Sequence, residues 1–267
     1  WASRGSGFGA VGLPGPAGWA AGFGAVGALP RRSDPLIHTR RAGRAMMETM
    51  IVIRCGSAPV PTVLGEHPRI EVSEVPDKDE INRALAEVGT RRRLLVCGTD
   101  AGLATLLTRL MRSENLDVEV AYIAEEDTPA TRAYGLPTGS AAAKLGVQGQ
   151  AHEVPLVRDE TGAVLVGEAT VAGPRGELLV GEAYADDDKV FSGEVPTLTV
   201  RVSRDFPGVR ATVEKPRRFR RRRWFTARAV QFGSPGALIT RDGITARRPV
   251  KRTTFYRHVE PLRLVLP

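Results

Sequence analysis

The spacing of apolar residues changes once along this chain, near residue 148, and this change restricts the fold more than any other feature. Before it, short apolar runs alternate with segments whose apolar residues recur at helical spacing. After it, only short apolar runs separated by turn residues remain. A chain of this kind is expected to form an α/β unit followed by a separate antiparallel β unit.

The first half contains four predicted strands and two predicted helices. Asp77 is expected to cap the first helix and Gly89 to end it. Because such strands and helices form right-handed βαβ units, we predict a three-layer α/β domain over residues 46–150. The strands are Ile51–Ile53, Ile70–Val75, Leu94–Cys97 and Asp117–Ile123; the helices carry Ile81, Ala84, Leu85 and Val88, and then Leu103, Leu106, Leu107, Leu110 and Met111.

The second half is predicted to be an antiparallel β-sandwich domain over residues 151–267. Turn signals such as Glu160-Thr161-Gly162 and Gly173–Gly176 separate its apolar runs, and little of it has helical periodicity. The domain boundary is therefore expected near residues 148–153. The predicted strands include Val154–Val157, Ala163–Val166, Leu178–Val180 and Leu198–Val202.

Residues 1–45 differ in composition from the rest of the chain. They are dominated by Gly, Ala and Pro and carry no charge from Gly5 to Pro30. Repeated glycines and two prolines make this segment a poor membrane helix, and it lacks the Leu-rich core of a signal peptide. We expect it to be disordered, or to be translated sequence upstream of a start near Met46, Met47 or Met50.

The basic residues are concentrated at the end of the chain. The net charge is +8, but residues from Lys215 onward carry +13 and the first 214 carry −5. Arginines interleaved with aromatics, as in this segment, suit an anionic membrane surface. A solvated strand or loop is the plain alternative, and nucleic acid ranks third because no nucleic-acid-binding motif accompanies the segment. The basic patch comprises Arg217, Arg218, Arg220, Arg221, Arg222 and Arg223, beside Phe219, Trp224 and Phe225.

Cysteine and histidine usage excludes several kinds of site. The two cysteines, Cys55 and Cys97, cannot form a disulfide framework or a four-cysteine zinc site. The four histidines show no metal-ligand spacing. We therefore expect a cytoplasmic protein, peripheral to the membrane if the basic patch binds lipid.

Two glycine-containing loops are candidates for chemistry. The first, Gly98–Gly102, follows a predicted buried strand and precedes a helix, where backbone N–H groups and the helix end can hold a phosphate. In the second, a Pro137-x-Gly139 turn precedes a short Ala-rich helix with Ser140 at a plausible N-cap. Either loop alone is also explained by turn geometry or helix capping.

The pair of loops, in this order and about forty residues apart, resembles the diacylglycerol kinase-like lipid kinases. That family shares its nucleotide-binding domain with NAD kinases and sphingosine kinases. Its first loop reads G-G-D-G-T and its second L-P-x-G-T-x-N-D; this chain retains Gly98, Asp100 and Gly139, and Ser140 keeps a hydroxyl. Residues 242–244 are similar to the D-G-E segment that follows in the family's β-sandwich.

The resemblance implies ATP-dependent phosphorylation of a lipid hydroxyl, with ATP and Mg²⁺ as cofactors. Such a transfer needs positioning, charge neutralisation and a base for the attacking alcohol. Asp242 is implied to be that base, and no metal ligand is assigned. The implied partner is a lipid substrate. The basic patch adds an anionic membrane surface as a partner, and the oligomeric state, monomer or homodimer, is left open. The implied nucleotide-contacting residues are Gly98, Thr99, Asp100, Ala101 and Gly102 in the first loop, and Gly139 and Ser140 in the second.

This chain also departs from the family's motifs. Thr99 and Ala101 replace two glycines of the first loop, and an added Cβ there obstructs close approach of a phosphate. Ala142 and Ala143 replace the Asn and Asp of the second loop, and Ile244 replaces the Glu of D-G-E. These losses point to weakened or absent kinase activity. The alternatives are a non-catalytic nucleotide- or lipid-binding regulatory protein of the same fold and, less favoured, a nucleic-acid-associated protein.

Overall fold

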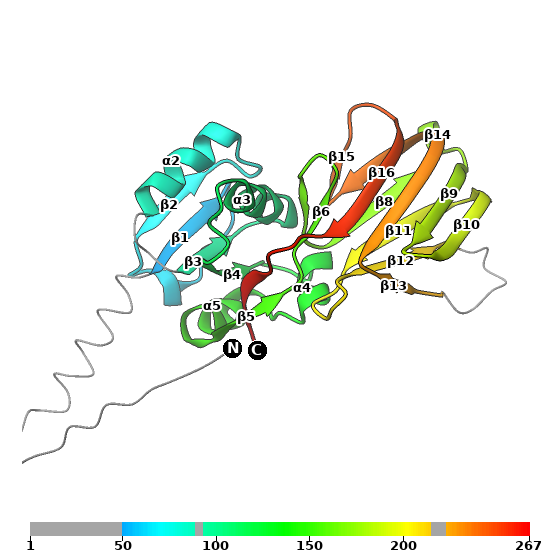
Figure 1. Cartoon of the computed structure of the whole chain (residues 1–267). Coiled ribbons are helices and arrows are strands. Elements are labelled where there is room, and N and C mark those ends of the chain that lie inside the picture. The colour runs from blue at the N-terminus through cyan, green and yellow to red at the C-terminus, as the bar shows by residue number, and fades with distance from the viewer. Residues whose placement is uncertain (1–49, 89–92, 215–222) are drawn as a thin grey trace, which may run out of the picture.

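A six-stranded, mainly parallel sheet forms the first unit of the computed structural model, which describes residues 50–88, 93–214 and 223–267 (Figure 1). Five strands run parallel in the order β2-β1-β3-β4-β17, and β5 is added antiparallel to β17 at the edge. The strands are β1 (Met50–Cys55), β2 (Arg69–Val72), β3 (Arg93–Cys97), β4 (Glu119–Ile123), β5 (Gln150–Val154) and β17 (Leu262–Leu266).

Helices cover both faces of this sheet, which confirms the predicted three-layer α/β domain (Figure 1). Alternate residues of β1 point to opposite faces: Ile51 and Ile53 pack with α2 (Lys78–Val88) and α3 (Asp100–Arg112), whereas Val52 packs with α5 (Gly139–Gln148). A short 3₁₀ turn, η1 (Thr62–Leu64), joins α5 on its face, and α4 (Pro129–Tyr134) lies between β4 and α5 in the chain.

The helix boundaries follow from local hydrogen bonds. The Asp77 carboxylate accepts from the backbone N–H groups of Asp79 and Glu80, as expected of a cap at the start of α2. The predicted end of that helix, Gly89, lies outside the described residues. At the start of α3, Thr99 is the N-cap and its hydroxyl accepts from the Gly102 N–H.

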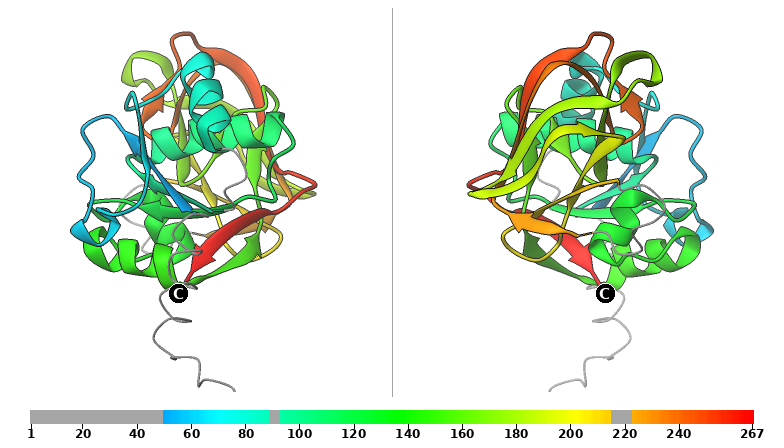
Figure 2. Two further views of the ribbon diagram at one scale, coloured as in Figure 1. Left: turned by 90° about the vertical axis from the view of Figure 1, so that its left-hand side faces the viewer. Right: turned by 90° about the vertical axis from the view of Figure 1, so that its right-hand side faces the viewer.

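The second unit is a large antiparallel β domain, as predicted from residues 151–267. The long strand β14 (Ala229–Arg241) pairs with β9 and β16 through its first half and with β8 and β15 through its second, so two sheets share it. Figure 2, right, shows the strands of this unit curving around a common interior. The remaining elements are β6 (Val157–Asp159), β7 (Val164–Leu165), β8 (Glu168–Ala172), η2 (Pro174–Gly176), β9 (Leu179–Ala185), β10 (Asp188–Val195), β11 (Thr197–Val202), β12 (Val209–Val213), β13 (Phe225–Ala227), β15 (Ile244–Thr245) and β16 (Val250–Arg257).

The chain returns to the first unit at its end. The expected boundary near 148–153 assigns both β5 and β17 to the second domain, whereas both pair in the six-stranded sheet. Leu264 and Val265 are almost fully buried between β4 and β5. An apolar run shows that a strand is buried, but it does not show which sheet the strand joins.

Two further predictions fall partly or wholly outside the described residues. The expected leader, 1–45, lies outside them, and so do Arg217, Arg218, Arg220, Arg221 and Arg222 of the basic patch. Arg223 is described; it is exposed, and its guanidinium lies 4.4 Å from the centre of the Phe225 ring.

Candidate functional site

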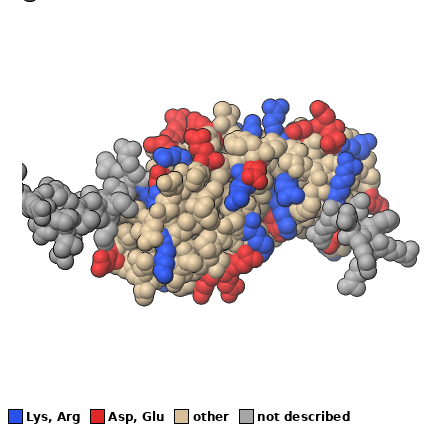
Figure 3. All heavy atoms as spheres, turned by 90° about the horizontal axis from the view of Figure 1, so that it is seen from below, with Lys and Arg blue, Asp and Glu red and all other residues tan. Residues whose placement is uncertain are grey.

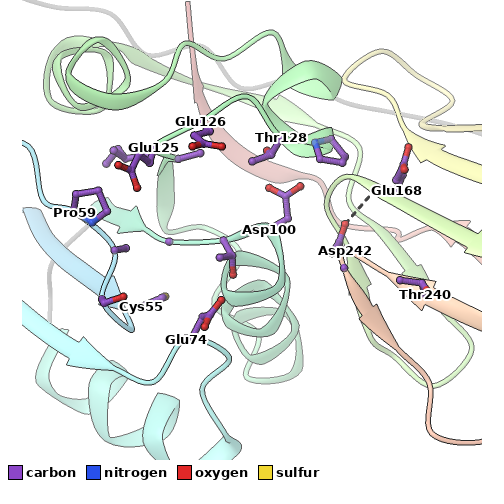
Figure 4. A pocket seen from close by; sticks show the side chains of 18 of the residues that line it. Cys55, Pro59, Glu74, Asp100, Glu125, Glu126, Thr128, Glu168, Thr240 and Asp242 are labelled. Carbon is purple, nitrogen blue, oxygen red and sulfur yellow. Dashed lines mark hydrogen bonds between the residues drawn. The ribbon is translucent and has the colours of Figure 1, made fainter.

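A cavity of about 600 Å³ lies where the two units meet. Its first wall is built from the carboxyl ends of β1, β3 and β4, where ligands of open α/β sheets bind. Its second wall comes from β8 and from the turn after β14. Figure 4 shows Asp100 and Asp242 entering this space from the two units. The turn after β3, which leads to Asp100, and the turn after β14, which carries Asp242, therefore meet at one cavity.

Asp100 is the first residue of α3, directly after the turn that leaves β3. Its side chain is buried, and its two oxygens accept hydrogen bonds from the Tyr122 hydroxyl at 2.8 Å and the Ala130 N–H at 3.0 Å. The negative carboxylate also suits the positive end of α3. These contacts hold Asp100 in place and leave each oxygen with a further lone pair.

Asp242 is placed by a two-residue hairpin turn. Asp242 and Gly243 have φ angles of 44° and 86° between the paired residues Arg241 and Ile244, and Asp-Gly is a preferred sequence for such a turn. The carboxylate accepts three backbone N–H groups of the segment 166–168, at 2.8–3.2 Å. The turn is thereby fixed to the start of β8.

Burial dominates the ionisation of Asp242. Desolvation raises the pKa of this carboxyl to about 7, against the three N–H donors, which favour the charged form. The negative charge of Asp100 raises the pKa further. A carboxyl with such a pKa can give up or accept a proton near neutral pH.

The predicted first-loop residues separate into two groups. Gly98, Thr99 and Asp100 line the cavity. Ala101 instead faces a smaller neighbouring groove of about 220 Å³ that also reaches Asp242. Gly102 packs inward: a Cβ added there would lie 2.8 Å from the Glu74 carbonyl oxygen.

The glycines of this loop are required by its packing against β1. A Cβ on Gly98 would lie only 2.7 Å from the Cys55 Cβ, closer than real contacts allow. The Thr99 hydroxyl oxygen accepts a hydrogen bond from the Gly102 N–H at 3.3 Å, so this N–H is not available to a phosphate. Packing alone therefore requires glycine at positions 98 and 102, with or without a bound phosphate. It does not require glycine at positions 99 and 101, where this chain has Thr and Ala.

The second loop lies beside the cavity and not in its lining. Gly139 adopts a φ of 54° and donates its N–H to the carbonyl of Ala124, which does line the cavity. Neither Gly139 nor Ser140 is among the lining residues, and Ser140 is exposed. Ala142 and Ala143 are buried against the sheet, so these two positions contribute to the core and not to the cavity.

Carboxylates supply the charge of the cavity lining. Among the described residues, six acidic side chains line the cavity and no Lys, Arg or His does. Two of them, Glu125 and Glu126, follow Ala124 at the carboxyl end of β4, and their place just after a predicted strand is a signal in the sequence. Glu74 and Glu168 reach the cavity only through the tertiary fold. The full set is Glu74, Asp100, Glu125, Glu126, Glu168 and Asp242.

The acidic side chains do not form a ready-made metal site. Within the described residues, no group of three or more His, Cys, Asp or Glu side chains is close enough to hold a metal ion. A divalent cation bound here therefore needs other ligands, such as water or the oxygens of a bound phosphate. Mg²⁺ is commonly held in this way, through one or two carboxylates.

Solved structures of two kinds of kinase resemble this chain. A diacylglycerol kinase from Bacillus anthracis matches with a TM-score of 0.60 over 82% of this chain and 97% of that one, at 11% sequence identity. An NAD kinase from Archaeoglobus fulgidus, crystallised in complex with ATP, matches with a TM-score of 0.53 over 81% and 93%, at 12% identity. This chain therefore shares its fold with this diacylglycerol kinase and this NAD kinase.

The likeness to these solved structures concerns the fold alone, because the identities are low. No protein-family model and no curated protein matches the sequence itself. The common fold explains why the α/β unit, the β domain and the cavity between them occur together. The chemistry of this protein has to be argued from its own side chains.

Proposed function

We propose that this protein is a diacylglycerol kinase-like phosphotransferase that binds ATP as its magnesium complex and phosphorylates a lipid hydroxyl. The observation that carries the proposal is the meeting of Asp100 and Asp242, from different units, in one cavity at the carboxyl ends of parallel strands. The NAD kinase of similar fold was crystallised with ATP, which supports a nucleotide as the ligand.

The lining fits a nucleotide only together with cations. A triphosphate placed among six carboxylates without a Lys or Arg would be repelled. Divalent cations remove that repulsion, and oxygen ligands are those that Mg²⁺ prefers. Asp100 is the residue that would hold the cation, with water and phosphate oxygens as its further ligands. When bound, Mg²⁺ would neutralise negative charge on the phosphates.

Asp242 is the residue that would remove the proton from the attacking hydroxyl. An ionised carboxylate has about four acceptor sites, and backbone N–H groups occupy three of those of Asp242. The remaining site is on Oδ2, since Oδ1 already accepts two of the three bonds. A pKa of about 7 suits such a base at neutral pH.

A second candidate function is a non-catalytic protein that keeps the cavity and binds a nucleotide or lipid. It is favoured by the first loop, where Thr99 caps α3 and Gly98 packs against Cys55. Both features leave the loop well formed without any ligand. This candidate predicts binding without phosphoryl transfer.

Thermal unfolding with and without Mg·ATP tests whether the protein binds the nucleotide. A nucleotide that binds only the native state raises Tm by mass action. Failure of Mg·ATP to raise Tm at any concentration up to several millimolar would exclude the nucleotide. ATP with EDTA is expected to give a much smaller shift, because the acidic lining is then not neutralised.

Transfer of labelled γ-phosphate to diacylglycerol then tests catalysis. Asp242→Asn is expected to lower the rate by about 10²-fold or more, because it removes the base. Asp187→Asn is the matched control, since Asp187 is an exposed acid in the β9–β10 turn. Full activity in Asp242→Asn would refute the assignment of the base, and binding without any transfer would favour the second candidate.

The anionic membrane partner belongs to the same proposal. Each helix within the described residues is too short or too polar to cross a bilayer, so contact through a basic surface is the route we propose. The described member of the patch, Arg223, is exposed and stacks on Phe225. Sedimentation with phosphatidylglycerol vesicles, weakened by salt and absent with phosphatidylcholine, is the expected result. Equal binding to both lipids would contradict it.

A further inference from the structure

A second, smaller pocket lies on the other side of Pro129 from the acidic cavity. It has a volume of about 190 Å³ and is lined by α4, by the end of β11, by β12 and by Trp224. Among the described residues, three arginines and no acid line it, the reverse of the cavity described above. Pro129 contributes to both linings. An acidic cavity and a basic pocket therefore lie on either side of the segment that contains Pro129.

Two of these arginines form a cross-strand pair of like charge. Arg201 on β11 and Arg210 on β12 are direct partners in the antiparallel register. Like charges directly opposite one another destabilise a sheet. Arg201 is also paired with Glu168 on its other side, at 2.8 Å. Within the described residues, no carboxylate is paired with Arg210, which faces Thr226 in the next strand.

Trp224 holds both guanidinium groups beside the pocket. The guanidinium carbons of Arg201 and Arg210 lie 5.1 and 5.0 Å from its ring centre. Cation–π contact of this kind lowers the cost of bringing the two arginines together but supplies no net negative charge. The third arginine, Arg132, is oriented by its ion pair with Asp127 at 2.7 Å. All three donors are thus preorganised around a space whose described lining contains no acidic side chain.

We infer that this pocket binds a phosphate group. Arginine forks match the oxygens of phosphate geometrically and are preferred for its recognition. A phosphate between Arg201 and Arg210 would convert their repulsion into attraction to a common partner. Ser203, which also lines the pocket, offers a hydroxyl donor to the same group. The phosphate can belong to a soluble molecule or to a lipid headgroup, and the two sources are separated by experiment.

Trp224 provides the means of measurement. The chain has three tryptophans, Trp1, Trp19 and Trp224. In the full chain carrying Trp1→Phe and Trp19→Phe, all tryptophan fluorescence reports on the pocket. Titration with inorganic phosphate at constant ionic strength is expected to change this fluorescence saturably. The absence of a saturable change would overturn the inference.

A pair of matched substitutions separates a specific pocket from general attraction. Arg210→Gln is expected to weaken phosphate binding on the order of tenfold, because a charge-assisted contact is lost. Arg248→Gln removes the same charge from an exposed position before β16 and is expected to leave binding unchanged. Equilibrium dialysis with labelled phosphate gives a second readout, since Arg210 contacts the fluorophore. Equal weakening by the two substitutions would overturn the inference.

Vesicles identify the source of the phosphate. Phosphatidylcholine vesicles with and without phosphatidic acid are added to the single-tryptophan protein loaded with phosphate. If vesicles with phosphatidic acid displace the bound phosphate, and do not do so in Arg210→Gln, the ligand is a lipid headgroup. Saturation by inorganic phosphate without any competition from vesicles supports a soluble ligand. Neither result depends on the kinase activity proposed for the acidic cavity.

Discussion

Substitution of Asp242 with asparagine tests the energetic consequence of burying a carboxyl where the two units meet. The residue is 8% exposed, and three backbone N–H groups of the segment 166–168 bind its oxygens. Burial is the largest effect on its ionisation and raises its pKa from 3.8 to about 7. Asparagine has the same shape and cannot ionise. The two proteins should therefore differ in how stability depends on pH.

The direction of this dependence follows from proton binding. In the unfolded chain the carboxyl of Asp242 loses its proton near pH 4, whereas in the folded protein it keeps the proton up to a pH of about 7. Between these values the folded state binds more protons, so the free energy of unfolding falls as pH rises. At about 1.4 kcal/mol for each pKa unit, the loss reaches about 4 kcal/mol by pH 7.

Urea unfolding of both proteins from pH 4 to pH 8 measures this loss. The free energy of unfolding of the natural protein minus that of Asp242→Asn is expected to fall by up to about 4 kcal/mol between pH 4 and 7, and to be constant above that range. Asp187→Asn, the exposed control, should follow the natural protein. A difference that does not change with pH, or that increases with pH, would refute the assignment of a buried, protonatable carboxyl.

Three substitutions and a thiol-labelling experiment test the packing. Gly167→Ala is expected to destabilise the protein by about 1–3 kcal/mol in urea, because its Cβ would lie 2.8 Å from a backbone nitrogen of α4. Gly233→Ala, with open space at its Cβ, should change stability by less than about 1 kcal/mol. Leu107→Ala, in the fully buried face of α3, should cost about 2–5 kcal/mol. Burial raises the pKa of Cys55 to about 12 and that of Cys97 to about 11, so both thiols should react with iodoacetamide at pH 8 far more slowly in the folded than in the urea-unfolded protein.

The elements of the fold were largely predictable because their patterns are local. The apolar run at Leu94–Cys97 and the helix capped by Asp77 depend on neighbours within a few residues. The sheet that β17 joins was not predictable, since a short apolar strand fits any buried position. Pairing of β17 with β4 and β5 depends on contacts between residues more than a hundred positions apart.

The site was predictable where it lies at the end of an element. Asp100 and Asp242 stand at a helix start and in an Asp-Gly turn, and both positions carry a local signal. Glu168 reaches the acidic cavity through strand pairing, and the opposition of Arg201 and Arg210 depends on the register of β11 and β12. A single sequence gives no register for strands connected by loops of this kind.

Insertion of β17 between β4 and β5 has a consequence for the order in which the protein can fold during synthesis. Among the described strands of the finished sheet, β5 pairs with β17 alone, and the first residue of β17 is made more than a hundred positions later. At about 5–20 residues per second, the ribosome needs roughly 5–20 s to reach it. During that interval the nascent α/β unit carries an open edge at β4, and a chaperone or a second nascent chain has access to the place that residues 262–266 later fill.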